Sequence, residues 1–455
     1  MILLEPSQNG FAVSVDGHRV LSHSRRAPCV AIGRSDGAIR ATRGAEAPRR
    51  RRPSAVPLKS FQIVESDPDL VVIEFEGRLQ VALRMKEGRL RIAFSPNDAS
   101  ANYFRLRLAA CPDEHIYGCG DRVPKRGERF DLKGELVPLW VQDRGAIGAP
   151  SGLLSRKGSR RASGVHFPLP VFVSSRGYWC AIDSSAYAEL DFRRRAVTIL
   201  RSWGVPREVV LGFGENPPQL LAGLTALLGR QSAPPAWCFD GICIGLAGGT
   251  EAVERKLDEA FEAGVKVASV WLEDWCGRRA PGTGLPKDWT RDEALYPDLA
   301  GLVERLRSRG IRCLGSIGPL LPAGGRLFAD ASAAGLCVKD GDGGDYLLHA
   351  GPQQAAMVDV SGEAGVAWLK DLITRELLGA SMAGWIADYG EQLPLDAVLS
   401  SGESALRAHN RWPVLWAKVN REATEESGRA GETAFFMRSG WLGSSRQAPG
   451  CFSAD

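Results

Sequence analysis

Acidic side chains follow the ends of apolar runs at several places in the second half of this 455-residue chain. Asp388 and Glu391 come just after "AGWIA", while Glu273 and Asp274 come directly after "VASVWL". Arg438 follows a third apolar run, "TAFFM". Paired carboxylates at such positions can bind sugar hydroxyls and attack or protonate at an anomeric carbon. Capping of the following helix is the alternative role for each acid taken singly.

Tryptophans accompany these acids, and indole rings stack well on the faces of pyranose rings. We expect Trp289 and Trp385 to contribute to substrate binding; the other tryptophans nearby are Trp271, Trp275 and Trp441. Acids and aromatics together predict a carbohydrate site, which no single acid does alone.

Apolar runs alternate with amphipathic segments from residue 231 onward, which predicts parallel strands joined by helices. The segment Gln231–Trp237, with two prolines, marks the expected domain boundary. Two folds fit this alternation, a (β/α)₈ barrel and a doubly wound sheet. No GxGxxG motif follows the first strand, so the dinucleotide-binding reading of the second fold is weakened. In a barrel, catalytic groups lie at the carboxyl ends of the strands. The expected strands are 239–246, 265–275, 311–321, 382–390 and 433–441, and the expected helices are 250–264, 299–310, 362–379 and 404–426.

Residues 1–230 consist mostly of short runs of strand-forming residues separated by turn residues, as in "VVIEFEGRLQVALRM" and "GRLRIAFS". This spacing is typical of an antiparallel β-sandwich. The predicted fold is therefore α/β plus β, with an N-terminal β-sandwich at 1–230 and a barrel domain at 231–455.

The composition argues against several classes of function. A net charge of +4 is too small to indicate a nucleic-acid partner. No run of about 18 apolar residues predicts a membrane span. Ten cysteines occur without a CxxC pair, so a zinc ribbon is not expected, and their scatter through apolar runs favours a reducing cytoplasm. Nothing in the composition determines an oligomeric state.

Several longer motifs, in order along the chain, resemble glycoside hydrolase family 31, and most of all its bacterial sulfoquinovosidase and α-glucosidase branch. They are "YGCGDR", "FPLPVFVSSRGYWCAIDSSAY", "GLAGGTEAVERKLDEAFEAGVKVASVWLEDWCG", "GWIADYGEQLP", "HNRWPVLWAKVNREA" and "FFMRSGWLGS". The resemblance covers nearly the whole chain from about residue 60.

The resemblance implies a retaining α-glycosidase that acts by double displacement on a carbohydrate substrate. It implies that Asp388 is the nucleophile and that Asp455, seventeen residues after Arg438, is the acid/base. Such a pair works at a separation of about 5–5.5 Å. Arg438 would hold a substrate hydroxyl, and Glu391 would orient groups near Asp388. Neither a metal nor an organic cofactor is implied.

The sequence departs from the family pattern at several positions, so the resemblance does not determine which sugar is the substrate. The sulfoquinovosidase branch reads its sulfonate with an arginine and a tryptophan three residues apart. Trp289 occupies the tryptophan position, but Pro286 occupies the arginine position, with Lys287 beside it as a substitute cation. Ala247 replaces a polar side chain of the branch, and Glu273 stands where it has glutamine or glutamate. Both α-glucosides and sulfoquinovosides therefore remain candidate substrates.

The family's barrel continues beyond the acid/base position. We therefore expect an incomplete barrel, ending at about the start of its sixth strand, and an alternative function as a non-catalytic sugar-binding relative or an inactive fragment.

Overall fold

The computed structural model describes residues 1–35, 39–42, 45–48, 53–120, 130–141, 167–279, 284–350 and 353–451, with the backbone alone at 39–42, 45–48, 350 and 451. These residues form two compact units, which are described one at a time. The first comprises Met1–Ala41, Glu46–Arg144 and Ser151–Leu228, and most of the second is Gly229–Asp455.

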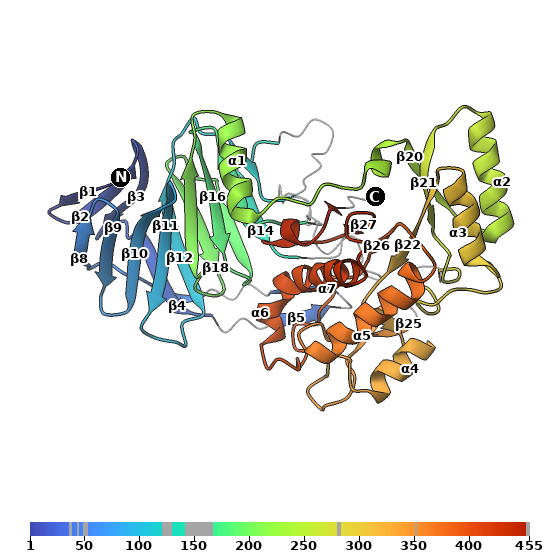
Figure 1. Ribbon diagram of the computed structural model, residues 1–455. Helices are drawn as coiled ribbons and strands as arrows, with labels where there is room; N and C mark the ends of the chain where they lie inside the picture. Colours follow the sequence, from blue (N-terminus) through green and yellow to red (C-terminus); the bar gives the residue numbers. More distant parts are fainter. Residues whose placement is uncertain are drawn as a thin grey trace. The chain divides into compact units, whose positions relative to one another are not determined.

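The first unit is built from antiparallel sheets (Figure 1). Its larger sheets have the strand orders β13-β15-β16-β19-β11-β10-β9-β8 and β14-β17-β18-β12-β4-β7, and a third has the order β1-β2-β3. Phe94 of the first sheet and Phe104 of the second are in ring contact at 4.6 Å, as expected of two sheets that share a core. The predicted β-sandwich is therefore present.

The strands of this unit are short. In β9 half-buried and fully buried side chains alternate, whereas β16 and β17 are buried at almost every position. Their bounds are β1 Ile2–Ser7, β2 Gly10–Val15, β3 His18–Ser24, β4 Val30–Arg34, β7 Ser54–Pro57, β8 Gln62–Asp67, β9 Leu70–Phe75, β10 Leu79–Lys86, β11 Arg89–Pro96, β12 Tyr103–Ala109, β13 Ile116–Gly118, β14 Leu136–Leu139, β15 Val171–Ser174, β16 Tyr178–Asp183, β17 Ala188–Asp191, β18 Val197–Ser202 and β19 Glu208–Phe213. The helix α1, Pro217–Leu228, follows the last of them. A separate pair is formed by β5, Ile39–Thr42, and β6, Ala45–Pro48.

The second unit contains a parallel sheet in the order β20-β21-β22-β26-β27-β28. Each strand pairs with the next one of the sheet along the chain, and the order never reverses. A doubly wound sheet would reverse its order at a switch point, so this order is that of a barrel. The predicted alternation of strands and helices is confirmed, and the doubly wound alternative is excluded.

The sheet strands are β20 Ile242–Leu246, β21 Val267–Leu272, β22 Arg312–Ile317, β26 Gly384–Ala387, β27 Ala434–Met437 and β28 Gly450–Cys451. The helices are α2 Gly249–Glu262, α3 Leu299–Ser308, α4 Arg326–Ala333, α5 Glu363–Ile373, α6 Ala405–Ala408 and α7 Trp412–Glu426. The short helical turns are η1 Ala236–Phe239, η2 Thr374–Leu378, η3 His409–Arg411 and η4 Ser444–Arg446.

The helix boundaries follow the capping residues of the sequence. The Asp298 side chain accepts a hydrogen bond from Gly301 N at the start of α3, and Gly310, with φ of 80°, follows its end. Gly264 ends the α2 segment in the same left-handed conformation. Pro413 lies in the first turn of α7, where its missing N–H costs no hydrogen bond.

A small antiparallel sheet of this unit is absent from the sequence-based prediction. It consists of β23 Leu320–Pro322, β24 Leu347–Ala350 and β25 Gln353–Met357, in the order β23-β25-β24. The run 311–321 is predicted as one strand, but Gly318 and Pro319 separate β22 from β23. A side chain at Gly318 would meet the Tyr389 ring at 2.9 Å, so close packing explains the break.

Candidate active site

Asp388 lies directly after β26, at the carboxyl end of the central part of the parallel sheet. All four residues of β26 are buried, which fixes the strand from both faces. The backbone N–H of Asp388 donates to the carbonyl of Ile317, the last residue of β22, at 2.8 Å. The side chain itself is buried, with 10% of its surface exposed. The carboxylate is thereby held where barrel enzymes place their reactive groups.

Two guanidinium groups face this carboxylate from different segments. Arg279 Nη1 lies 3.6 Å from Asp388 Oδ2, and Arg438 Nη1 lies 3.7 Å from Oδ1. Each oxygen therefore has its own cation. Charge-assisted contacts of this kind stabilise a buried anion and restrict its rotation.

Glu391 fixes the second of these cations. Its Oε1 accepts from Nε of Arg438 at 3.0 Å and also from Nη2 of the same guanidinium. Glu391 is almost fully buried, and its Oε2 has no hydrogen-bond partner among the described residues. One oxygen thus orients Arg438, and the other is buried without a hydrogen-bond partner among the described residues.

Arg279 is held by neighbours on three segments. It donates to the carbonyl of Gly284 at 2.6 Å and to Ser316 Oγ of β22 at 2.8 Å, and a longer contact of 3.5 Å reaches Tyr389 Oη. Its guanidinium carbon lies 6.0 Å from the centre of the Trp289 ring, within the range of a cation–π contact. Arg279 therefore links the segment that precedes Trp289 to the residues around Asp388.

Tyr389 adopts the left-handed backbone conformation, with φ of 59°, immediately after Asp388. Such a conformation is costly for a bulky residue and often marks a functional turn. Its hydroxyl donates to Gly284 O at 2.7 Å, and Arg438 lies over its ring at 4.8 Å. Burial and the nearby Asp388 charge raise the pKa of Tyr389, so the hydroxyl remains a donor.

A cavity of about 350 Å³ opens at the ends of β20 and β21. It is lined by Ala247, Gly248, Glu273, Asp274, Arg278 and Arg279. Both oxygens of Asp274 are engaged, since Oδ2 accepts from Gly248 N at 2.8 Å and Oδ1 from Tyr296 Oη at 2.6 Å. Asp274 therefore shapes the cavity wall, and Glu273 is the carboxylate of the pair that is more exposed to the cavity.

The structure brings together Asp388, Glu391 and Arg438, and it places Glu273 and Asp274 along the adjoining cavity. Trp289 is fully buried, and its Nε1 donates to Leu320 O at 2.8 Å. This bond fixes the indole ring near which the Arg279 guanidinium lies. Asp455 lies outside the described residues.

Of the remaining expected binding residues, Trp385 lies in the core, and Lys287 stays a prediction. Trp385 is fully buried, and its Nε1 donates to Asn420 Oδ1 of α7 at 2.8 Å, so it is a core residue between strand and helix. Successive side chains of a strand point to opposite faces of the sheet. The side chain of Trp385 therefore points to the face of β26 that α7 covers. Lys287 is exposed and, among the described residues, its side chain has no ion pair.

Arg279 and Tyr389 were not predicted from the sequence. Arg279 does not follow an apolar run; it comes five residues after Asp274, in the basic pair "RR" at 278–279. That pair beside a strand-end acid is the one signal that could have indicated it.

The described residues contain no group of three or more side chains suited to hold a metal ion. Burial raises the pKa of the Cys276 thiol to about 12, which makes it a poor nucleophile at neutral pH. No helix of the described part is long and apolar enough to cross a membrane.

Comparison with known proteins agrees with this geometry. Residues 231–455 match the model of the glycosyl hydrolases family 31 TIM-barrel domain. The chain is 33% identical to the sulfoquinovosidase of Escherichia coli (strain K12) over 462 residues, which cover 99% of this chain and 67% of that protein. The chain belongs to glycoside hydrolase family 31. It is thus a glycoside hydrolase of a family that acts on α-glycosides, and the predicted resemblance is confirmed.

Other members of the family are similar along the same length. The sulfoquinovosidase of Agrobacterium fabrum (strain C58) is 31% identical over 460 residues, with 99% of this chain and 68% of that protein covered. The solved structure of a family 31 sulfoquinovosidase from E. rectale, in complex with an aza-sugar inhibitor, matches all of this chain and 68% of its own. Its TM-score is 0.91 at 32% identity. A Flavobacterium johnsoniae family 31 dextranase, at 16% identity and a TM-score of 0.66, shares the fold.

Proposed function

We propose that this family 31 glycoside hydrolase is a retaining enzyme in which Asp388 attacks the anomeric carbon. The observation that supports the proposal best is the carboxylate of Asp388 at the end of β26, facing one guanidinium at each oxygen. These two positive charges stabilise the ionised carboxylate before substrate binds. Such preorganisation lowers the cost of forming a covalent glycosyl intermediate.

In this proposal Asp455 is the acid/base that protonates the leaving oxygen and later activates water. Its assignment rests on the family motif, seventeen residues after Arg438. Glu391 orients Arg438, and Glu273 binds hydroxyls from the cavity side. The sandwich and barrel domains correspond to 1–230 and 231–455.

We further propose that the sugar carries an anionic group, as sulfoquinovose does. The curated relatives with the highest identity reported above are sulfoquinovosidases. Pro286 removes the arginine that the branch places three residues before Trp289. Arg279 offers a guanidinium over the same ring, at 6.0 Å from its centre, and the exposed Arg278 lines the cavity beside it. The site therefore contains the cations needed to read an anion, supplied from another point of the chain.

The test compares hydrolysis of 4-nitrophenyl α-sulfoquinovoside and 4-nitrophenyl α-glucoside by the chain and two variants. Asp388→Asn should abolish turnover of both substrates. Asp330→Asn, an exposed acid of α4, is the matched control and should leave the rates unchanged. A kcat/KM ratio that favours the sulfonated substrate at least tenfold is expected.

The outcomes separate the parts of the proposal. Preference for the glucoside would overturn the proposal of an anionic substrate and would not affect the assignment of Asp388 as the nucleophile. Turnover that persists in Asp388→Asn would overturn the nucleophile. A fluorinated glycosyl donor should label Asp388, and a label mapped to Glu391 or Glu273 would likewise contradict the assignment. Binding of sugar without any turnover would favour the alternative, a non-catalytic relative.

A further inference from the structure

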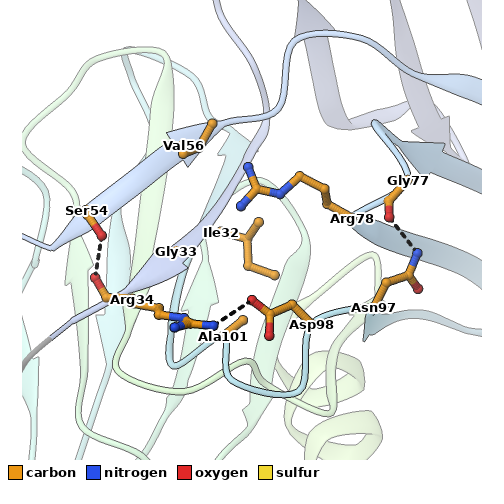
Figure 2. Close-up of a pocket in the computed structure, with 10 residues that line it drawn as sticks. All are labelled: Ile32, Gly33, Arg34, Ser54, Val56, Gly77, Arg78, Asn97, Asp98 and Ala101. Carbon is orange, nitrogen blue, oxygen red and sulfur yellow. Dashed lines mark hydrogen bonds and ion pairs between the residues drawn. The ribbon is translucent and has the colours of Figure 1, made fainter.

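A second cavity lies in the β-sandwich unit. Its volume is about 510 Å³, within the range of small-molecule sites. Figure 2 shows its lining, which comes from paired strands β4 and β7, from the turn between β9 and β10, and from the loop after β11. The lining residues are Ile32, Gly33, Arg34, Ser54, Val56, Gly77, Arg78, Asn97, Asp98 and Ala101.

Backbone hydrogen bonds hold the turn and the loop of this cavity in place. Gly77 has φ of 62°, a left-handed conformation that glycine adopts without strain. Asn97 Nδ2 donates to Gly77 O at 2.8 Å, and Asn97 N donates to Arg78 O at 3.0 Å. The loop is therefore fastened to the turn, and the cavity between them is a built feature of the sandwich.

Of the two arginines that line the cavity, one is paired with an acid. Arg34 is neutralised, because its Nη2 donates to Asp98 Oδ2 at 3.3 Å and also contacts Ser100 Oγ. Glu76, the acid next to the turn, accepts from the backbone N–H groups of Lys59 at 2.6 Å and Ser60 at 2.9 Å.

Arg78 has no ion pair or side-chain hydrogen bond within the described residues. Figure 2 shows its guanidinium extending over the cavity toward Ile32 and Val56. Among the described lining residues, the charged groups are thus two arginines and one aspartate, a net positive charge. A free guanidinium fork fits a carboxylate or sulfonate in bidentate geometry.

The rest of the lining suits a sugar. Val56, which is exposed, and Ala101 offer an apolar surface on which the C–H face of a ring can lie, whereas Ile32 is almost fully buried. Asp98 can accept further hydrogen bonds from hydroxyls, and Ser54 Oγ, which donates to Arg34 O at 3.1 Å, can accept one. A bare inorganic anion would use the fork and leave the apolar surface unused.

We propose that this cavity is a non-catalytic binding site for an acidic saccharide, with Arg78 as the residue that binds its anionic group. The site is separate from the residues around Asp388 and does not depend on the assignment of the nucleophile.

The test measures binding of three probes by ligand-observed NMR and by titration calorimetry. The probes are methyl α-glucuronide, methyl α-glucoside and acetate, and the protein is the chain with Asp388→Asn, in which turnover is removed. The variant Arg78→Gln should weaken glucuronide binding at least about tenfold, since it removes a charged hydrogen-bonding group. Arg78→Lys keeps the charge without the fork and should fall between the two.

The matched control is Arg84→Gln, which changes another exposed arginine of the same unit, on β10 and outside the cavity lining. It should bind glucuronide as the parent does. Equal binding by Arg78→Gln and its parent would overturn the proposal. Acetate that binds as tightly as glucuronide would also overturn it, because the site would then be a simple anion site. Glucoside that binds as tightly as glucuronide would overturn it as well, because the site would then not distinguish charged from neutral sugars.

Discussion

Arg279→Gln is the substitution that tests the candidate site most directly. It removes two charge-assisted hydrogen bonds, to Gly284 O and Ser316 Oγ, each contributing about 1.5–3 kcal/mol. The freed side chain regains about 2 kcal/mol of rotamer entropy, so the net loss of stability is about 1–4 kcal/mol. The substitution also removes the cation that lies 3.6 Å from Asp388. At an effective dielectric constant of about 20 this attraction is about 4–5 kcal/mol before desolvation is subtracted.

We expect kcat/KM on an aryl α-glycoside to fall about 10²–10³-fold, which corresponds to about 2.7–4 kcal/mol of transition-state stabilisation. Steady-state kinetics with an activated leaving group measures the loss, and thermal unfolding reports the stability. Arg279→Lys restores a charge near Asp388 without the fork and should recover part of the rate. The control is Arg255→Gln, which removes an exposed i,i+4 ion pair of α2 and should change neither quantity appreciably.

A kcat/KM of Arg279→Gln within threefold of the parent, in a folded protein, would refute this reasoning. It would mean that the guanidinium does not support Asp388 during the reaction. Equal losses in the Lys and Gln variants would show instead that the fork geometry, and not the charge, is what matters.

Three further predictions concern other contacts. Gly245→Ala would place a Cβ 2.4 Å from Oε1 of Glu273, so we expect that carboxylate to shift by about 1 Å. The value of kcat/KM should then fall about 10²-fold with little change in melting temperature. An unchanged rate would show that Glu273 does not act on substrate. Arg438→Met leaves Glu391 buried without its cation and should cost about 3–5 kcal/mol of stability. Adding Glu391→Gln to this variant should recover at least about 1 kcal/mol of the loss. If the stability losses of the two single variants, measured by denaturant unfolding, simply add in the double variant, the pairing is contradicted. Burial alone would raise the pKa of Asp191, but hydrogen bonds from two arginines outweigh it and hold the pKa at about 2 instead of 3.8. Because a lowered folded-state pKa favours folding above about pH 4, about 2 kcal/mol should be lost as the pH falls toward 2; Asp191→Asn should lack this loss, and identical pH profiles of unfolding would oppose it.

The first five strands of the parallel sheet and most of the helices could be predicted because their signals are local. Each of these strands lies in an apolar run, and α3 begins at an aspartate cap and is followed by a glycine, whereas the short elements α4 and β28 were not predicted. Asp388 and Arg438 could be located for the same reason, since both follow such runs directly. The small sheet β23–β25 gave no comparable signal, because its first strand continues an apolar run that only tertiary packing at Gly318 interrupts.

The candidate site was predicted less completely because side-chain direction is not local information. Trp385 and Asp388 are three residues apart, yet one packs against α7 and the other faces the strand-end site. Arg279 reaches Asp388 across 109 positions of the chain, and no spacing rule predicts such a contact. The sequence places Lys287 next to Pro286, and its binding role stays a prediction; the cation near the Trp289 ring is Arg279, ten residues earlier in the chain.

The arrangement around Arg438 explains why two acids follow β26. Glu391 engages Nε and Nη2 of the guanidinium through a single oxygen, and this leaves Nη1 turned toward Asp388 at 3.7 Å. An arginine bound instead in bidentate fashion by Asp388 would occupy both oxygens of the proposed nucleophile and compete with the anomeric carbon for its lone pairs. Because Glu391 takes the stronger contact, Arg438 approaches Asp388 only as a nearby charge. The second acid of "ADYGE" therefore fixes the arginine, and the first remains free to react.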